Sequence, residues 1–149
     1  MEKYDLIIIG GGPGGYEAAL EASKVHGMKT ALVENRELGG TCLNRGCIPT
    51  KTLLHSADLL YELKNHGETI GLRGYGEIAC DMAALNRRKN DVVSQLISGI
   101  ESLMKAGKIT VYRGTGTILD KGLVRVALNE GGTENLECDN ILIERNLEQ

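Results

Sequence analysis

Two closely spaced cysteines give this sequence its clearest chemical signature. Cys42 and Cys47 stand in the segment Gly39 to Lys51, GGTCLNRGCIPTK, with Gly46 just before the second cysteine and Pro49 just after it. A loop of this length could close as a disulfide between the two sulfurs and reopen on reduction. Because reversible opening of a disulfide moves an electron pair, the pattern predicts a redox function.

A zinc site and a purely structural disulfide are the other interpretations of these cysteines. A zinc site would need further Cys or His ligands at close spacing, but Cys80 and Cys138 are isolated and lack paired histidines. A structural disulfide is disfavoured because the N-terminus has no secretory signal and the cytosol keeps ordinary thiols reduced. We expect no metal site, and we expect Cys80 and Cys138 to be inert, partly buried thiols.

The residues before the cysteines have the pattern of a dinucleotide-binding unit. An apolar run, Tyr4 to Ile9, is followed at once by Gly10 to Gly15, GGGPGG, and by an alanine-rich helical stretch. This is the motif G-x-G-x-x-G between a strand and a helix. Gly10 allows the tight turn, Gly12 lets a diphosphate approach the backbone, and Gly15 lets helix and strand pack closely. The helix N-terminus would supply N–H donors to the phosphates.

A second predicted strand, Lys29 to Glu34, ends in an acid at the distance from the glycines where a ribose hydroxyl would be held. Glycines alone could form a flexible turn, but the strand, the helix and the acid together favour a dinucleotide site. The motif does not separate NAD from FAD, because both carry the same adenosine diphosphate end.

The first part of the chain, and Gly39 to Lys51 above all, resembles the FAD domain of the pyridine nucleotide-disulfide oxidoreductases. In that family the pattern G-G-T-C-x-N-x-G-C-x-P-x-K holds the redox disulfide against the flavin, and this sequence fits every fixed position. The similarity is greatest to the dihydrolipoamide dehydrogenase branch, on the residues Leu43, Ile48, Thr50, Lys51 and the following Leu53 to Ala57. Glutathione and mercuric reductases are the related alternatives.

The resemblance implies different roles for the two cysteines. Cys42 would be the interchange thiol that forms a mixed disulfide with substrate, and Cys47 would be the sulfur that faces the flavin as a thiolate. Gly46 and Pro49 indicate a helix beginning near Cys47, and a thiolate near a helix N-terminus has a lowered pKa. Lys51 matches the family lysine beside the flavin, where its positive charge would favour the reduced, anionic ring.

The expected FAD contacts follow the same motifs. They are Gly10, Gly12, Pro13, Gly14, Gly15, Glu34, Asn35, Gly40, Thr41, Cys42, Lys51 and Gly116. Gly116 is included because the family's chain passes the adenine at the step Gly114 to Gly116; a simple turn glycine is the alternative.

The activity that the resemblance implies is oxidation of protein-bound dihydrolipoyl groups, with electrons passing through the disulfide to FAD and then to NAD. The implied partners are lipoyl-carrying proteins of 2-oxoacid dehydrogenase or glycine-cleavage complexes, and the complete enzyme would be a homodimer. A self-standing FAD-binding or thiol-redox module without dehydrogenase activity is the alternative.

We expect an α/β fold over residues 1–149: a Rossmann-like FAD-binding domain with a central parallel sheet and a small antiparallel β-meander. Apolar spacing predicts a helix from the cysteine pair to about Lys64 and a second amphipathic helix over Val92 to Met104, whose apolar stripe we assign to core packing. Turn residues separate the remaining predicted strands, which are Ile109–Tyr112, Thr117–Leu119, Leu123–Leu128, Leu136–Cys138 and Asn140–Ile143.

The C-terminal residues depart from the family pattern. Asn140 to Ile143 resembles the strand that leads into Ala-Thr-Gly, but Glu144 to Gln149 follows. No second G-x-G-x-x-G is present for a nicotinamide cofactor, and His26, His55 and His66 lie in contexts unrelated to the family's acid–base histidine. We therefore expect an apparently truncated N-terminal portion of the enzyme, with the NAD-binding and dimer-interface domains absent and little turnover by itself.

Composition excludes several other classes. The 149 residues are 42% hydrophobic and carry a net charge of −3, which argues against a nucleic-acid partner. No apolar run is long enough to span a membrane, so we expect a cytoplasmic protein without a membrane partner. The basic run Arg87 to Lys89 is expected to be a solvated face rather than a binding patch.

Overall fold

The computed structural model of the chain describes residues 1–144 and separates into two compact units. Unit 1 contains residues 1–41 and the chain from residue 97 onward, and unit 2 contains residues 42–96. The predictions that concern residues 145–149 lie outside the described residues.

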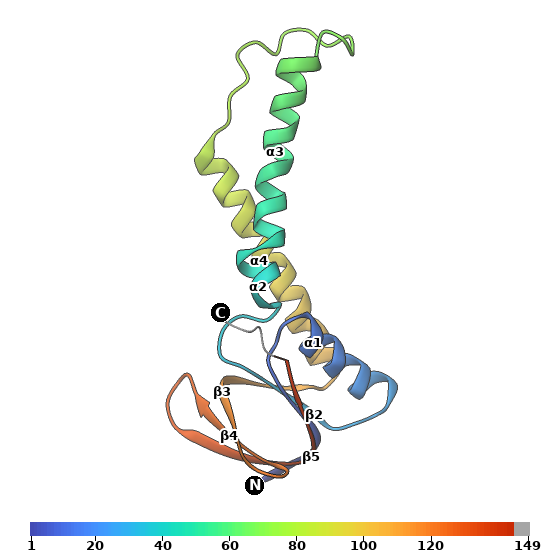
Figure 1. Ribbon diagram of the computed structural model, residues 1–149, viewed down its shortest axis with the longest axis vertical. Helices are drawn as coiled ribbons and strands as arrows, with labels where there is room; N and C mark the ends of the chain where they lie inside the picture. The colour runs from blue at the N-terminus through green and yellow to red at the C-terminus, as the bar shows by residue number, and fades with distance from the viewer. Residues whose placement is uncertain (145–149) are drawn as a thin grey trace. The chain divides into compact units, whose positions relative to one another are not determined.

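Unit 1 is built on five strands: β1 (Glu2–Ile9), β2 (Thr30–Glu34), β3 (Thr110–Asp120), β4 (Leu123–Leu128) and β5 (Thr133–Ile143). β1 pairs in parallel with β2 and with β5, and β2 pairs in parallel with β3. β4 pairs antiparallel with both β3 and β5, so the hydrogen bonding closes into a circle (Figure 1). The parallel sheet and the antiparallel meander expected from the sequence are therefore both present.

The strands β3 and β5 are longer than the sequence predicted. Residues 110–113 of β3 pair with β2 and residues 114–120 pair with β4, so the two runs predicted on either side of Gly114 are one continuous strand. In the same way, β5 joins the runs predicted at Leu136–Cys138 and Asn140–Ile143. Along each of these two strands the hydrogen-bonded neighbour changes from one strand to another. No turn is therefore needed between the runs that the sequence predicted as separate strands.

The core of unit 1 lies inside the ring of strands. Its buried residues are Tyr4, Ile7, Ala31, Val33, Val124, Val126, Leu136 and Cys138. In β2, β4 and β5 these residues alternate along the strand, as expected for side chains on one face. On the other face of β1 and β2, Ile8 and Leu32 are also fully buried. Burial on both faces is typical of parallel strands and explains the continuous apolar run in β1.

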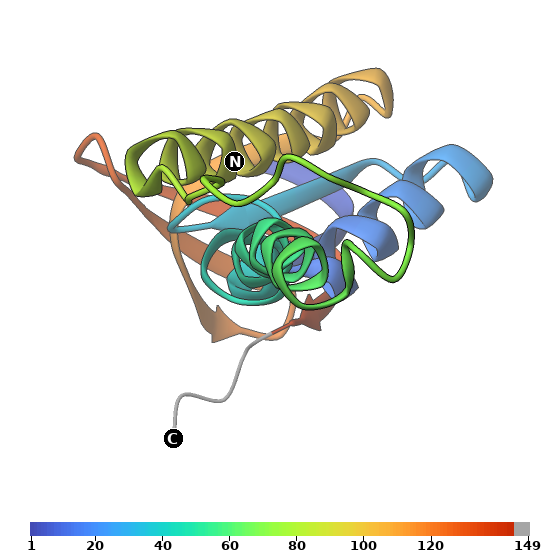
Figure 2. The ribbon, with the colours of Figure 1, turned by 90° about the horizontal axis from the view of Figure 1, so that it is seen from above.

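Helix α1 (Pro13–Leu20) follows the glycine segment and contacts β1 and β2, and its last turn continues as the π-helix η1 (Glu21–Val25). The C-terminal part of helix α4 (Met82–Ala106) also belongs to unit 1. In Figure 2, α1 is the blue helix and α4 is the long helix coloured from olive to gold. The Ser23 hydroxyl donates to the carbonyl of Gly107 just beyond α4, and Arg113 Nη2 lies 2.6 Å from Glu101 Oε1. The first contact joins η1 to the end of α4, and the second joins α4 to β3.

Unit 2 contains α2 (Gly40–Arg45) from residue 42 onward, α3 (Cys47–His66) and the N-terminal part of α4. The predicted helix after the cysteines is confirmed, but it has no buried residue; Leu54 is 51% and Tyr61 60% exposed. The core-packing assignment of the α4 stripe holds only at its C-terminal end, where Ile100 and Met104 are buried while Leu96 is exposed. The pattern identified the helix without identifying what covers its apolar side.

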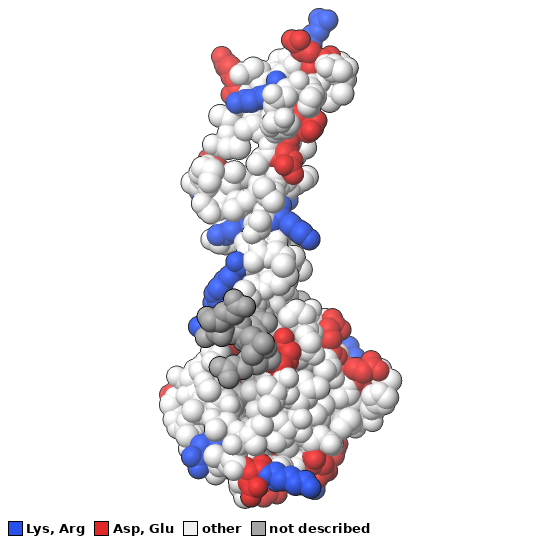
Figure 3. Space-filling view, viewed as in Figure 1, with Lys and Arg blue, Asp and Glu red and all other residues white. Residues whose placement is uncertain are grey.

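Charge on the chain is mixed in sign. On the face of unit 1 seen in Figure 3, acidic and basic side chains lie near the edges and no extended basic patch is visible. Among residues 1–144, no helix has a stretch that is both long and apolar enough to cross a membrane.

Candidate functional site

The parallel strands of unit 1 end at one edge, and most of the predicted cofactor residues lie there. β1 ends at Ile9, β2 at Glu34 and β5 at Ile143, and the parallel part of β3 ends at Arg113. In open parallel sheets, ligands bind outside the carboxyl ends of the strands. This edge is therefore the candidate binding site of unit 1.

The glycine segment leaves β1 in a turn that only glycine adopts easily. Gly10 has φ of +116°, and its N–H donates to the carbonyl of Val33 at 2.9 Å, which ties the start of the turn to β2. Gly12 is the N-cap of α1 without a side-chain cap, and Pro13 occupies the first helical turn. Pro there costs no helical hydrogen bond. The sequence thus builds a short backbone loop around the N-terminus of α1.

Gly15 allows α1 to lie close to β1. A methyl group placed on Gly15 would collide with the carbonyl oxygen of Gly10 and would lie 3.5 Å from Ile8 Cγ2. Gly40 plays a similar part on the far side of the loop, because a methyl group there would lie 3.0 Å from the Cα of Gly12. The N–H of Gly39 donates to Gly11 O at 2.8 Å, so the segment before Thr41 is held against the glycine loop.

Glu34 fixes the other side of the loop. Its Oε2 accepts from the Gly11 N–H at 2.7 Å and its Oε1 accepts from the Arg36 N–H at 2.7 Å. The next residue, Asn35, accepts at its carbonyl from Asn129 Nδ2 at 2.9 Å, and Arg113 Nη1 donates to Arg36 O at 3.1 Å. The carboxylate predicted to hold a ribose is therefore also a brace between β1 and β2.

Gly116 has a packing reason to be glycine. It lies inside β3, paired with Val126, and a methyl group on it would lie 3.2 Å from Ile9 Cγ1. The alternative of a simple turn glycine is wrong, because the residue is within a strand. The predicted adenine contact at this position stays a prediction.

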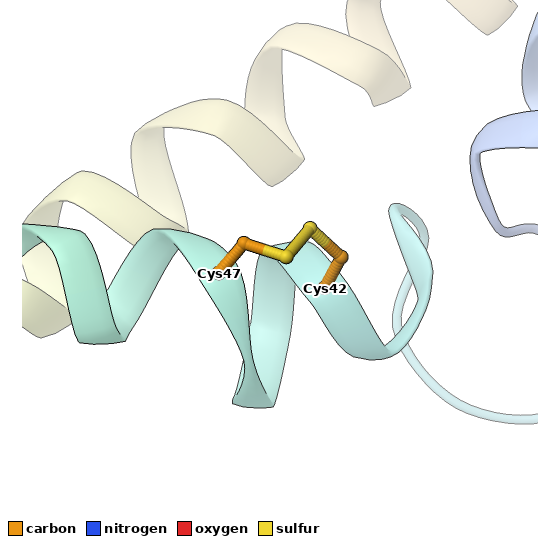
Figure 4. The surroundings of a disulfide bond; sticks show 2 residues. All are labelled: Cys42 and Cys47. Carbon is orange, nitrogen blue, oxygen red and sulfur yellow. A yellow bond between two sulfur atoms is a disulfide. The ribbon is translucent and has the colours of Figure 1, made fainter.

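Cys42 and Cys47 form a disulfide in unit 2, with their Cα atoms 4.8 Å apart (Figure 4). Cys42 lies within the short helix α2 and Cys47 is the first residue of α3. Gly46 separates the two helices and accepts at its carbonyl from the Thr50 N–H at 3.1 Å. Pro49 stands in the first turn of α3, where no helical N–H donor is needed. Cys42 and Cys47 are both exposed residues.

Both cysteines of the disulfide stand near a helix N-terminus. The first turn of a helix carries unpaired N–H groups and the positive end of the helix dipole. Cys47 is the first residue of the 20-residue helix α3 and Cys42 is the third residue of the six-residue helix α2, so both cysteines stand in the first turn of a helix. Lys51 lies one turn further along α3, on the same face as Cys47.

The other two cysteines differ from each other. Cys138 is buried in the core of unit 1, and burial together with the neighbouring Asp139 raises the pKa of its thiol, as expected for an inert cysteine. Cys80 is exposed, and the prediction that it is partly buried is wrong. His26, His55 and His66 are also exposed. In residues 1–144, no group of three or more His, Cys, Asp or Glu side chains is arranged to hold a metal ion.

One site residue was not predicted. Glu144 directly follows β5, and its Oε2 accepts from the Gly12 N–H at 3.1 Å. A signal was available, since a residue after a strand parallel to β1 must lie at the same edge as the glycine loop. In the sequence, Glu144 stands out only as a departure from the family pattern.

Comparison with known proteins gives one consistent result. A family model described as pyridine nucleotide-disulphide oxidoreductase matches residues 4–143. The dihydrolipoyl dehydrogenase of Trypanosoma brucei brucei is 40% identical over 144 residues, and dihydrolipoyl dehydrogenase 3 of Pseudomonas aeruginosa is 44% identical over 146 residues. Each alignment covers 96% of this chain and 30% of the relative.

A solved structure is similar over the same region. The HOCl-induced flavoprotein disulfide reductase RclA from Escherichia coli, determined as a Cu(II) complex, matches with a TM-score of 0.78 and 31% identity. The match covers 97% of this chain and 29% of that chain. The chain spans 30% of the length of the two curated relatives above.

Proposed function

The chain belongs to the pyridine nucleotide-disulphide oxidoreductase family, and on that premise we propose that it holds FAD on unit 1 and exchanges electrons with a dithiol through Cys42 and Cys47. The observation that carries the proposal is the disulfide at the N-terminus of α3, in the motif that the family uses for its redox centre. The substrate class that fits is a dihydrolipoyl group, by similarity to the dihydrolipoyl dehydrogenases.

The donors of the glycine loop fit the diphosphate of FAD. The N–H groups of Gly11 and Gly12 already bind carboxylate oxygens, so the loop accepts anions. The N-terminus of α1 adds the N–H groups of its first turn and the positive end of the helix dipole. Pro13 and Gly14 line this turn, and Gly12 and Gly40 carry no side chain that would block it.

Glu34 fits the ribose end. A carboxylate has about four lone-pair positions, and Glu34 uses one on Gly11 and one on Arg36. The remaining positions would accept the two ribose hydroxyls. Asn35, Thr41 and Gly116 are proposed as further contacts to the same cofactor.

Bound FAD would supply an acceptor for an electron pair, and the chain's own residues perform the thiol chemistry. A thiolate of the substrate attacks Cys42 Sγ, forming a mixed disulfide and breaking the Cys42–Cys47 bond. Cys47 leaves as a thiolate stabilised at the N-terminus of α3. The second thiolate of the substrate then attacks the substrate's first sulfur, which is bonded to Cys42 in the mixed disulfide. This step releases the substrate as a cyclic disulfide and Cys42 as a thiol. The chain ends with two more electrons and one more proton, carried as the Cys42 thiol and the Cys47 thiolate, and the second proton of the substrate dithiol goes to solvent.

For the longer protein we propose dihydrolipoyl dehydrogenase activity with NAD, a homodimer, and lipoyl-carrying partners of 2-oxoacid dehydrogenase or glycine-cleavage complexes. The nicotinamide step is assigned to segments outside this sequence, and the chain alone is expected to turn over slowly if at all. Lys51 is proposed to lie beside the flavin, where its charge favours the reduced ring.

The test is the visible spectrum of the chain after incubation with FAD and desalting, followed by one equivalent of dihydrolipoamide. Retained flavin, together with a long-wavelength absorbance that Cys47→Ser abolishes and Cys42→Ser preserves, is the expected result. Two new thiols without retained flavin would favour a self-standing thiol-redox module. Neither flavin nor dithiol reactivity would overturn the proposal.

A further inference from the structure

Glu144 places a negative charge on the glycine loop. Its main-chain N–H donates to Ile9 O at 2.8 Å, which continues the parallel pairing of β5 with β1 past the end of both strands. The side chain then reaches across the loop, where Oε2 accepts from the Gly12 N–H at 3.1 Å. The hydrogen bond to Ile9 O positions the main chain of Glu144, and the hydrogen bond from Gly12 N, at the N-cap of α1, positions its carboxylate.

The side chain fills the space that the glycines leave open. A methyl group placed on Gly12 would lie 2.6 Å from Glu144 Oε1, and one on Gly14 would lie 3.0 Å from Glu144 Cγ. The loop is free of side chains of its own at these positions. Its open volume over the N-terminus of α1 is occupied by the carboxyl group of Glu144 instead.

A diphosphate would need the same place and the same donors. Backbone N–H groups at a helix N-terminus bind phosphate and carboxylate oxygens alike. A phosphate at Gly12 N would lie within van der Waals contact of the Glu144 carboxylate, and like charges at such distances repel. Glu34 does not conflict in this way, because its carboxylate bonds to the neighbouring amide, Gly11 N, and braces β2.

We propose that Glu144 is an internal competitor for the phosphate position of the glycine loop, and that its carboxylate must leave Gly12 N before a dinucleotide diphosphate binds. The inference rests on the proposed dinucleotide site of unit 1, and adds to it the residue that sets the affinity. The side chain acts as a gate on cofactor binding, which weakens the affinity of this chain for any ligand that carries a diphosphate.

Glu144→Gln provides the cleanest test. Glutamine has the same size and keeps an oxygen that can accept from Gly12 N, so the loop retains its contact while the charge is removed. Glu144→Ala is the second variant, and Glu130→Gln, at an exposed turn between β4 and β5, controls for the change in net charge. Each chain is titrated with FAD by flavin fluorescence, and with inorganic pyrophosphate by the amide resonance of Gly12.

Glu144→Ala should tighten both FAD and pyrophosphate binding by about tenfold, the value of one charge-assisted hydrogen bond that no longer has to be broken. Glu144→Gln should tighten both by a smaller factor, because a neutral hydrogen bond to Gly12 N remains while the negative charge is removed. Glu130→Gln should leave both affinities unchanged. FAD and pyrophosphate binding that is equal in the parent chain and the Glu144 variants would overturn the proposal while the FAD site stands. Pyrophosphate binding that tightens without FAD binding in any chain would support the proposal about Glu144 and contradict the proposed cofactor. If neither ligand binds to any chain, both proposals fail.

Discussion

Replacing Glu34 with alanine should destabilise unit 1 even without a cofactor. The carboxylate accepts two short hydrogen bonds, from Gly11 N and from Arg36 N, each at 2.7 Å. Arg36 is exposed, and water can replace the lost acceptor there, whereas Gly11 is buried. Leaving a buried N–H without an acceptor costs about 1 to 3 kcal/mol, so we expect a loss of about 2 kcal/mol in the free energy of unfolding, nearly all of it from Gly11.

The assay is reversible urea unfolding together with a thermal melt. For a chain of this size a loss of about 2 kcal/mol lowers the melting temperature by about 4 to 8 °C. Glu34→Gln keeps one oxygen acceptor and should fall between the parent chain and Glu34→Ala. Glu130→Ala, at an exposed turn, is the matched control and should change stability by less than about 0.5 kcal/mol.

The argument fails if Glu34→Ala and Glu130→Ala unfold at the same urea concentration. It also fails if Glu34→Gln loses as much stability as Glu34→Ala, since the loss would then not depend on an acceptor at Gly11 N. The same three variants separate bracing from cofactor binding: FAD affinity of Glu34→Ala, measured well below its melting temperature, should fall about tenfold if ribose contacts are also lost.

Two further predictions concern thiols and pH. In the oxidised folded chain, only Cys80 should react rapidly with Ellman's reagent, because burial raises the pKa of Cys138; reduction should add Cys42 and Cys47, and unfolding should add Cys138. Two rapidly reacting thiols before reduction would contradict the assigned burial. Burial, and then the hydrogen bond with Tyr4, raises the pKa of Tyr112 far above its ordinary value, so the folded chain keeps this proton after the unfolded chain has lost it. The free energy of unfolding should therefore fall as the pH rises above about 10, by less than about 1.4 kcal/mol per pH unit for this group. The measurement is urea unfolding of the parent chain and of Tyr112→Phe from neutral pH to pH about 11. Tyr112→Phe should show a smaller fall in the free energy of unfolding per pH unit than the parent chain. Equal slopes in the two chains would refute the assignment.

Local patterns predicted the elements of this chain well where one stretch of sequence carries the whole signal. The glycine turn at Gly10 needs a positive φ, and the residues that supply it are consecutive. The start of α3 at Cys47 follows from Gly46 before it and Pro49 within its first turn. The strand β4 was predicted with its observed bounds because turn residues flank it on both sides.

Predictions failed where the outcome depends on partners distant in sequence. The runs on either side of Gly114 looked like separate strands, because nothing local reveals that β3 pairs with β2 along one half and with β4 along the other. The apolar stripe of α4 is buried at Ile100 and Met104 but not at Leu96. The spacing of apolar residues shows which face of a helix is apolar, but it does not show which other element packs against that face. Cys80 was placed in the wrong burial class for the same reason.

Residue types and short spacings predicted the groups that could do chemistry: a cysteine pair at a helix start, a glycine loop between strand and helix, and an acid at the end of the next strand. Each depends on residue type and short spacing, which the chain order preserves. Only the tertiary structure decided what these groups contact. The parallel pairing of β1 with β5 brings Glu144 to Gly12 N across the fold, and the pairing of β1 with β2 brings Glu34 to Gly11 N. Those contacts arise because strands far apart in the chain end at one edge of a sheet, and no local pattern records which strands become neighbours.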